Sequence, residues 1–354
     1  MSKITIRTPN HLGDCLMAQP SIRALIAGRP NDDVNLLLPE WAEPIYRDAG
    51  ASKMLSLDNQ HLHGIKAIFL QRKLLKEGRF DIGVLLTPSF SSALAFYLGG
   101  VRERYGYNRE GRRYFLNHAV DPQPVKSLHR SEKYRYLIEQ IIGKADVAQP
   151  GISVSNALRQ KAADLLNRRG VKSEDQYVAI APQAIAESRR WGSNNYATLA
   201  VRIIEKLGHK VVLLGTAGEY EAGKAIINQA ANSVPVGGAA QIHNEIRIAN
   251  MCGKTDIETA AAMLSTAKLF IGNDSGLAHL AAAVDIPLVV LSGADSPAET
   301  SPISRKKIVI IRDQLDCISC VKNTCPKKGE AFMRCMKQIS VDEVLEAVRG
   351  LVSA

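Results

Sequence analysis

Residues 268–283 combine a short apolar run, a turn and an amphipathic helix, which is an arrangement that often binds anions. Three consecutive helix-capping residue types occupy positions 273–275, directly after an apolar run of strand length, and an apolar stripe begins after Gly276. Free N–H groups of Ser275 and Gly276, together with the helix dipole, favour a phosphate or pyrophosphate. His279, one turn further on, can donate to the same anion. An ordinary capped helix with a buried histidine is the alternative interpretation.

Three other residues that could do chemistry follow predicted strands elsewhere in the chain. Asp14 lies at the start of a helix, where it is either a general base or a helix cap. Arg189 lies in a loop that follows a strand, and its guanidinium can bind two diphosphate oxygens at once, as a bidentate donor. Glu219 ends a Gly-rich loop and can bind ribose hydroxyls. Because ligands bind at the carboxyl ends of parallel strands, these loops together suggest a site.

The cysteines of the C-terminal region are closely spaced. Cys317, Cys320, Cys325 and Cys335 follow the pattern C-x2-C-x4-C-x9-C, and four thiolates at such spacing can close a tetrahedral site for zinc or iron. Four free thiols that pack a loop are the alternative, because the second and third spacings depart from common zinc ribbons.

Composition limits the classes of protein to which the chain can belong. Its 354 residues are enough for two α/β domains, and 46% hydrophobic with 23% charged residues is typical of a globular protein. The sequence has no long apolar run and starts directly in a strand, so we expect a cytoplasmic protein. The net charge of +10 predicts anionic partners, which include nucleic acid, lipid headgroups and phosphorylated small molecules.

Strand and helix patterns alternate along the chain and predict two doubly wound α/β domains with a cleft between them, covering residues 1–155 and 156–354. The segment 99–135 is irregular and basic; a solvated face and an anionic ligand surface both explain it. Predicted strands cover 3–7, 34–38, 81–86, 177–182, 210–214, 269–271, 288–291 and 307–311, and the closing helix covers 341–351.

These motifs together resemble glycosyltransferase family 9, the ADP-heptose heptosyltransferases. The resemblance rests on the segments 13–25, 189–191, 215–219, 252–255 and 273–279. It implies the GT-B fold, with the acceptor bound by the N-terminal Rossmann-like domain and the nucleotide sugar by the C-terminal one. It also implies that Asp14 is the catalytic base.

The resemblance further implies a donor site made by Arg189, Glu219, Asp274, Ser275, Gly276 and His279. Arg189 stands where family members commonly carry lysine. Arginine keeps the positive charge but is bulkier than lysine, so a different donor geometry or another nucleotide sugar is an open alternative. The sequence contains no Asp-x-Asp motif, so we expect no cofactor in catalysis and a diphosphate charge that is met by the helix N-terminus and Arg189.

We therefore expect an inverting transferase that moves heptose from ADP-heptose to the lipopolysaccharide inner core. Arg112 and Arg113 are the predicted acceptor-binding residues, and other basic residues are expected to hold the protein against the anionic inner membrane. Two alternatives remain at this point. One is a transferase or epimerase of the same fold with another nucleotide sugar. The other is a basic nucleic-acid-binding protein with a four-cysteine zinc module. This second alternative does not account for the Asp14 loop.

Overall fold

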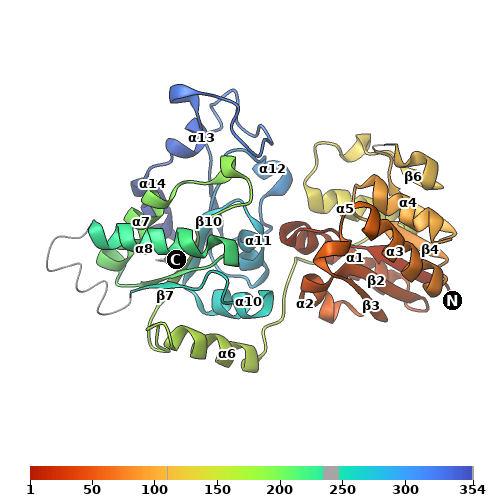
Figure 1. Cartoon of the computed structure of the whole chain (residues 1–354), viewed down its shortest axis with the longest axis horizontal. Coiled ribbons are helices and arrows are strands. Elements are labelled where there is room, and N and C mark those ends of the chain that lie inside the picture. The colour runs from red at the N-terminus through yellow and green to blue at the C-terminus, as the bar shows by residue number, and fades with distance from the viewer. Residues whose placement is uncertain (110, 234–246, 353–354) are drawn as a thin grey trace. The chain divides into compact units, whose positions relative to one another are not determined.

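The computed structural model describes residues 1–109, 111–233 and 247–352 of the chain. The chain divides into two compact units, Met1–Pro150 and Gly151–Ala354 (Figure 1). The predicted boundary lies a few residues later, before the helix that begins at Asn156. The backbone N–H of Ile152 donates to the carbonyl of Ala283 at 3.3 Å, so the segment that precedes this helix already belongs to the second unit.

The first unit is built on a six-stranded parallel sheet in the order β3-β2-β1-β4-β5-β6. This order is that of a doubly wound fold, with its topological switch between β1 and β4. The strands are β1 (Lys3–Arg7), β2 (Asp33–Pro39), β3 (Lys53–Leu57), β4 (Ile82–Leu85), β5 (Glu103–Tyr107) and β6 (His118–Val120).

Right-handed crossovers place the helices of this unit on both faces of the sheet. Helix α1 packs against α5, and α3 packs against α4, so the two pairs cover opposite faces. The principal helices are α1 (Leu12–Gly28), α2 (Glu43–Tyr46), α3 (Gly64–Gly78), α4 (Phe90–Leu98) and α5 (Arg130–Ile142), with short 3-10 turns between them that include η3 (Asn59–His61) and η4 (Arg112–Phe115).

The second unit repeats the same topology. Its parallel sheet has the order β12-β11-β10-β7-β8-β9, so the switch lies between β7 and β10. The strands are β7 (Tyr177–Ala181), β8 (Lys210–Leu213), β9 (Ile248–Asn250), β10 (Leu269–Asn273), β11 (Leu288–Leu291) and β12 (Lys307–Ile310). Strands β7, β10 and β11 are buried along their whole length, as expected for the centre of a parallel sheet.

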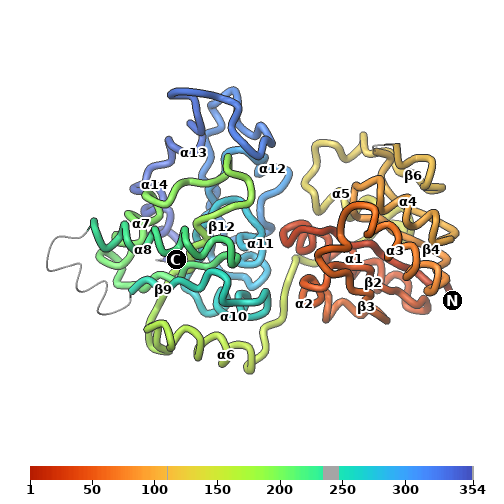
Figure 2. The backbone as a smooth tube through the Cα atoms, in the orientation of Figure 1, coloured from red at the N-terminus to blue at the C-terminus, as the bar shows by residue number. Residues whose placement is uncertain are grey.

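Helices on both faces of this second sheet close its core, and their path can be followed in Figure 2. The last helix packs Val344, Leu345 and Val348 into the same cluster as the strand residues Val178 and Ile271. The helices are α6 (Asn156–Asn167), α7 (Ser193–Leu207), α8 (Tyr220–Asn232), α10 (Ile257–Thr266), α11 (Gly276–Ala283), α12 (Pro297–Thr300), α13 (Arg334–Lys337) and α14 (Val341–Val352), with the turns η6 (Glu187–Arg189), η7 (Ala217–Glu219) and η8 (Gly329–Ala331).

The α/β fold with two doubly wound halves is thus as predicted, but the segment 99–135 is not irregular. It contains strands β5 and β6, the turn η4 and the start of α5. Strand β5 has the sequence Glu-Arg-Tyr-Gly-Tyr and is only partly buried, so it lacks the apolar run by which the central strands are recognised. In the described residues, no helix is long and apolar enough to cross a membrane.

Candidate active site

Asp14 lies in the first turn of α1, directly beyond the carboxyl end of β1. Arg7, the last residue of β1, is buried beneath the connecting loop and shapes it. Its Nη1 donates to the carbonyl of Thr8 at 2.8 Å, and its Nη2 donates to Oδ1 of Asn10 at 2.6 Å. Burial lowers the pKa of Arg7 to about 10, so the guanidinium remains charged at neutral pH. The hydrogen bonds from Arg7 therefore fix the loop that presents Asp14.

The Asp14 carboxylate is paired with a residue distant in sequence. Nη1 of Arg130, the first residue of α5, donates to Oδ1 of Asp14 at 2.9 Å. The Asp14 side chain keeps 16% of its surface exposed. Tyr134, one turn further along α5, is a second neighbour: burial, together with the nearby Asp14 carboxylate and a hydrogen bond to it, raises the pKa of this phenol well above its usual value. Asp14 is thus an oriented carboxylate that solvent can still reach.

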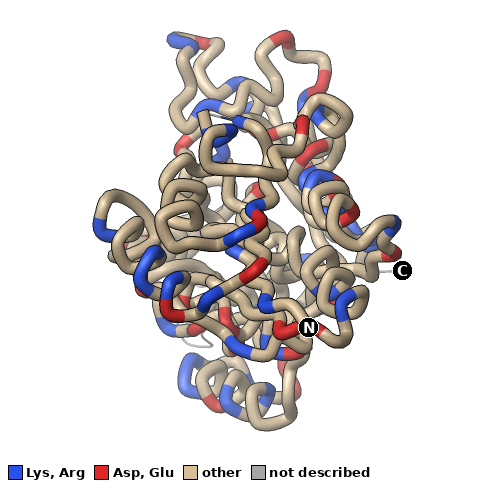
Figure 3. The backbone as a smooth tube through the Cα atoms, turned by 90° about the vertical axis from the view of Figure 1, so that its right-hand side faces the viewer, with Lys and Arg blue, Asp and Glu red and all other residues tan. Residues whose placement is uncertain are grey.

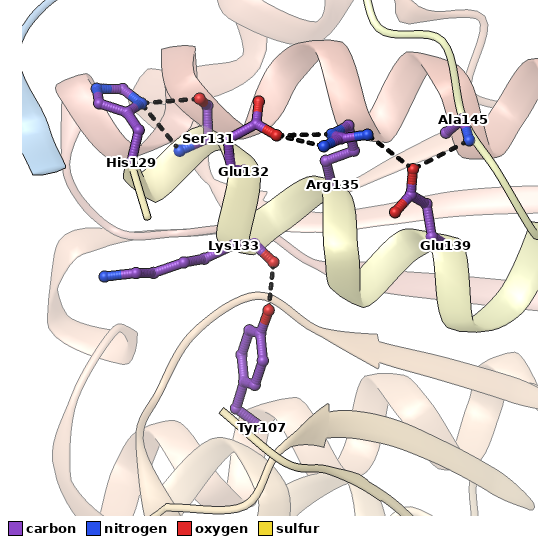
Figure 4. Close-up of polar contacts among 8 residues, drawn as sticks. All are labelled: Tyr107, His129, Ser131, Glu132, Lys133, Arg135, Glu139 and Ala145. Carbon is purple, nitrogen blue, oxygen red and sulfur yellow. Dashed lines mark hydrogen bonds and ion pairs between the residues drawn. The ribbon is translucent and has the colours of Figure 1, made fainter. Parts of the chain in front are cut away.

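Helix α5 is fixed by its own polar contacts, which are drawn in Figure 4. The His129 ring accepts from the backbone N–H of Ser131 and so caps the first turn, next to Arg130. Arg135 donates to Glu132 at 2.9 Å and to Glu139 at 3.0 Å (Figure 4). These contacts, together with the packing of α5 on α1, give Arg130 a defined position relative to Asp14.

The structure separates the two predicted acceptor-binding arginines. Arg112 is 1% exposed, and its Nη1 donates to the carbonyl of Thr87 at 2.6 Å, beyond the carboxyl end of β4. Arg113 is exposed. Arg112 thus lies inside the unit, where its guanidinium supports the Thr87 loop. Contacts of Arg112 and Arg113 with the acceptor stay predictions.

In the second unit, the loops after β7 and β10 meet at the switch point, and Asn273 joins them. This buried side chain accepts from the backbone N–H of Trp191 at 3.2 Å and from the hydroxyl of Tyr196 at 3.1 Å. Its amide donates to the carbonyl of Pro182 at 3.0 Å. The sequence suggests Asn273 only as a capping residue type, whereas its role in the structure is to bind the two predicted donor loops together.

The predicted anion site lies at the start of α11. Ser275 is the N-cap with an extended backbone, and Ser275 and Gly276 are half-buried. Asp274 is buried and accepts from the hydroxyl of Thr300 at 3.3 Å. Burial lowers the pKa of Lys307, and the Asp274 carboxylate partly offsets this effect, so a cation lies beside the site. His279 is buried in the first turn of α11.

Arg189, the last residue of η6, approaches the same end of the sheet. Its Nε forms an ion pair with Oδ2 of Asp295 at 2.6 Å, and the two side chains are 31% and 8% exposed. Asp295 follows β11, so it lies at the carboxyl edge that also carries Asp274. The guanidinium is held by one buried carboxylate while part of its surface is open to solvent. Sequence reasoning missed Asp295, since nothing in its local sequence points to Arg189.

Glu219 belongs to the loop after β8. Its Oε2 accepts from the backbone N–H of Thr216 at 2.6 Å, which completes a capping box. The adjoining loop after β9 approaches so closely that a Cβ at Gly253 would lie 2.5 Å from Cα of Ala217, and Gly253 has a positive φ of 69°. Only glycine fits there. A ribose contact of Glu219 stays a prediction, and it would use a carboxylate that already has a local partner.

The four clustered cysteines are half-buried free thiols. Burial, with contributions from the three other thiols, raises the pKa of Cys335, so the four lie in one neighbourhood. Yet nowhere in residues 1–109, 111–233 and 247–352 do three or more His, Cys, Asp or Glu side chains form a group that could hold a metal ion. The predicted zinc or iron site at Cys317, Cys320, Cys325 and Cys335 is therefore not supported, because the thiols are not arranged as ligands.

The segment that carries these cysteines is nevertheless hydrogen-bonded to the predicted donor loops. The backbone N–H of Ser188 donates to the carbonyl of Asn323 at 3.1 Å, and that of Ser319 donates to the carbonyl of Gly293 at 3.0 Å. The hydroxyl of Ser319 also donates to the carbonyl of Asp295 at 3.0 Å. The cysteine segment thus supports both partners of the Arg189–Asp295 ion pair.

Comparison with known proteins identifies the class. Residues 68–330 match the profile of glycosyltransferase family 9 (heptosyltransferase). The chain is 30% identical over 331 residues to lipopolysaccharide heptosyltransferase 2 of Escherichia coli K12, with 87% of each chain covered. The solved structure of E. coli ADP-heptose lipopolysaccharide heptosyltransferase II superposes with a TM-score of 0.78 at 27% identity, over 99% of this chain and 98% of that one.

A glycosyl transferase family 9 structure from Veillonella parvula has the same fold, with a TM-score of 0.80 at 19% identity over 99% of this chain and 97% of that chain. The chain belongs to glycosyltransferase family 9, the heptosyltransferases. The predictions of the family, of the two-domain α/β fold and of a glycosyltransferase that transfers heptose are therefore confirmed.

Proposed function

We propose that this protein transfers heptose from ADP-heptose to a sugar hydroxyl of the lipopolysaccharide inner core, with inversion at the anomeric carbon. Membership of the heptosyltransferase family carries the proposal. The geometry supports it, since each unit presents an oriented polar site at the topological switch of its own sheet. In this assignment the first unit binds the acceptor and the second binds the nucleotide sugar.

Asp14 is the general base of the proposed reaction. Its carboxylate takes the proton from the acceptor hydroxyl as that oxygen attacks the anomeric carbon, and the bond from this carbon to the ADP oxygen breaks on the opposite side. Arg130 positions the carboxylate through the 2.9 Å contact. One displacement of this kind inverts the configuration, and the proton stays on Asp14 until solvent removes it.

The second unit stabilises the ADP that leaves. The N–H groups of Ser275 and Gly276 at the start of α11, backed by the helix dipole, are the proposed diphosphate donors. Arg189 adds a cation that Asp295 keeps in place. Asp274 and His279 complete this site, and Glu219 is proposed to contact the ribose.

The lipid-linked acceptor gives the protein a location as well. We place it at the cytoplasmic face of the inner membrane, where basic side chains meet anionic lipid.

A direct assay tests the proposed function. The protein is incubated with ADP-heptose and with core lipid that lacks the heptose, and the masses of the products are measured by mass spectrometry. One added heptose with release of ADP is expected. Transfer from another nucleotide sugar, with none from ADP-heptose, would contradict the donor assignment.

A further inference from the structure

Helix α3 exposes two large apolar side chains to solvent. Ile65 is 73% exposed and Phe69 is 63% exposed, although both belong to a regular helix. Ala67, Gln71 and Leu75 on the opposite side are buried against the unit. Ile65 and Phe69 are four residues apart, so they lie one above the other on the outward face. Burial within the unit therefore does not explain them.

The neighbouring helix α4 is apolar on its outward face as well. Tyr97 and Leu98 are 50% and 44% exposed. Both follow Phe90, which is 44% exposed, at the seven- and eight-residue spacing that marks one face of a helix. Helices α3 and α4 pack against each other on the same face of the sheet (Figure 1). Their outward faces together form what we call the α3–α4 surface.

Cations continue the exposed stripe of α3. Arg72, Lys73 and Lys76 are exposed and lie three, four and seven residues after Phe69, which places them on the same outward face. In the parts of the chain that the structure describes, none of these three side chains forms an ion pair. Their charge is thus available to an external partner.

Net charge alone would not single out this surface. Lys and Arg are distributed over helices and loops with Asp and Glu among them (Figure 3). On the α3–α4 surface, apolar side chains of two regular helices are combined with cations for which the described residues provide no ion-pair partner. Helix α5 shows the contrast, because its Arg135 is paired with Glu132 and Glu139.

We propose that the α3–α4 surface docks on an anionic lipid bilayer. Helices that lie in the membrane interface carry large apolar side chains together with Lys and Arg, and tyrosine is enriched at headgroup level. A second copy of the chain fits less well, since a symmetric contact would bring the same cations face to face. The inference rests on the proposed function, in which the acceptor is held in a membrane.

The surface also adjoins the proposed acceptor loops. Helix α4 begins immediately after Ser89, beyond the carboxyl end of β4, and Arg112 supports Thr87 in the same connection. A bilayer in contact with α4 would therefore lie beside the edge of the sheet that presents Asp14. Docking on this surface keeps the site close to an acceptor that cannot leave the membrane.

Vesicle binding by the purified full-length protein tests the proposal. Phosphatidylcholine vesicles with and without phosphatidylglycerol are sedimented with the wild type, with Phe69→Ala and with Lys73→Ala/Lys76→Ala. Binding is expected only to the anionic vesicles and should weaken as salt rises. The double variant should bind roughly 10- to 30-fold more weakly and Phe69→Ala about 10-fold more weakly. Alanine favours helices, so α3 should stay folded.

A matched charge control separates docking from general attraction. Lys172→Ala/Lys206→Ala removes two exposed lysines of the second unit and should bind within about two-fold of the wild type, because neither lysine belongs to the α3–α4 surface. Equal weakening by both double variants would overturn the proposal. Concentration-dependent self-association that Phe69→Ala abolishes, without vesicle binding, would overturn it too and would assign the surface to a second copy.

Activity on a deacylated, soluble acceptor distinguishes this proposal from the proposed function. The α3 variants should transfer heptose to that acceptor at the wild-type rate and should lose rate only with acceptor presented in anionic vesicles. If the wild type does not transfer heptose to either acceptor, the proposed function fails while the vesicle result stands. Equal loss of rate on both acceptors would mean that α3 acts on the catalytic site and does not dock.

Discussion

At the scale of single residues, the two proposed sites share one design, in which a functional side chain is held by a partner from a distant segment. Arg130 holds Asp14 at a separation of 116 residues, and Asp295 holds Arg189. Sequence patterns found Asp14 and Arg189, because each follows a strand and is of a suitable residue type. They did not find the partners, since contacts of this kind are formed only by the fold.

Asp14→Asn should lower kcat by about 100-fold or more and leave the affinity for ADP unchanged, because an amide cannot accept the acceptor proton. Arg130→Ala should lower kcat less, by about 10-fold, since the base remains but loses its orientation. Single-turnover kinetics and ADP calorimetry measure both effects. Normal turnover of Asp14→Asn with a lowered melting temperature would mean that Asp14 only caps α1.

Arg189→Ala should weaken ADP binding by about 1.5–3 kcal/mol, the range for hydrogen bonds to charged groups. Arg189→Lys should keep most of the affinity, because it retains a cation that can reach the diphosphate. Calorimetry with ADP measures both variants. The interpretation fails if Arg189→Ala binds ADP normally and is merely less stable, as expected for a residue that serves only to neutralise Asp295.

At the scale of elements, periodicity predicted the central strands and the helices that pack on them. Helix α11 was located at 276–283, and the buried strands β7, β10 and β11 were each found to within a residue or two. The strands that sequence patterns missed lie toward the edges of the sheets. Strand β3, for example, is mostly exposed or half-buried, so it lacks the continuous apolar run of a central parallel strand.

The docking of α14 should depend on pH through Glu343. The Arg312 guanidinium holds the pKa of Glu343 below its usual value of 4.5. Stability from this pair is therefore present above about pH 4.5 and is lost as the pH falls through the lower, folded-state value. The Glu343 side chain is 40% exposed, so the contribution is only about 0.5–1 kcal/mol.

Urea unfolding of Glu343→Gln and of a matched control checks this expectation. Glu346→Gln removes the exposed Glu346–Arg349 pair from the same helix and should be nearly neutral. Glu343→Gln should be less stable than the wild type at pH 7, and the difference should shrink as the pH falls toward 3. A difference that persists unchanged at pH 3 would show that packing, and not the ion pair, is responsible.

At the scale of the whole molecule, the two units have separate cores. One cluster joins Leu37, Leu85 and Phe96 in the first unit, and another joins Val178, Ile271 and Leu345 in the second. The same strand order occurs in both units. Composition and alternation predicted this division, because each half contains its own series of buried strands.

Each unit should therefore fold alone, and nucleotide binding should belong to one of them. A fragment of residues 151–354 should show a cooperative thermal transition and bind ADP, whereas residues 1–150 should fold without binding ADP. Circular dichroism and calorimetry on the two fragments test this. Binding of ADP by the first fragment alone would contradict the assignment of donor and acceptor to the two units.

The cysteine segment has a practical consequence for how a preparation of this protein ages. Cys15 and Cys252 are buried, and burial raises the pKa of each thiol to about 12, so dissolved oxidants reach them last. The four half-buried thiols are more accessible, and their segment is hydrogen-bonded to Ser188 and Asp295. Storage in air should therefore impair nucleotide binding before it lowers the melting temperature, and a reducing agent should preserve the donor loops.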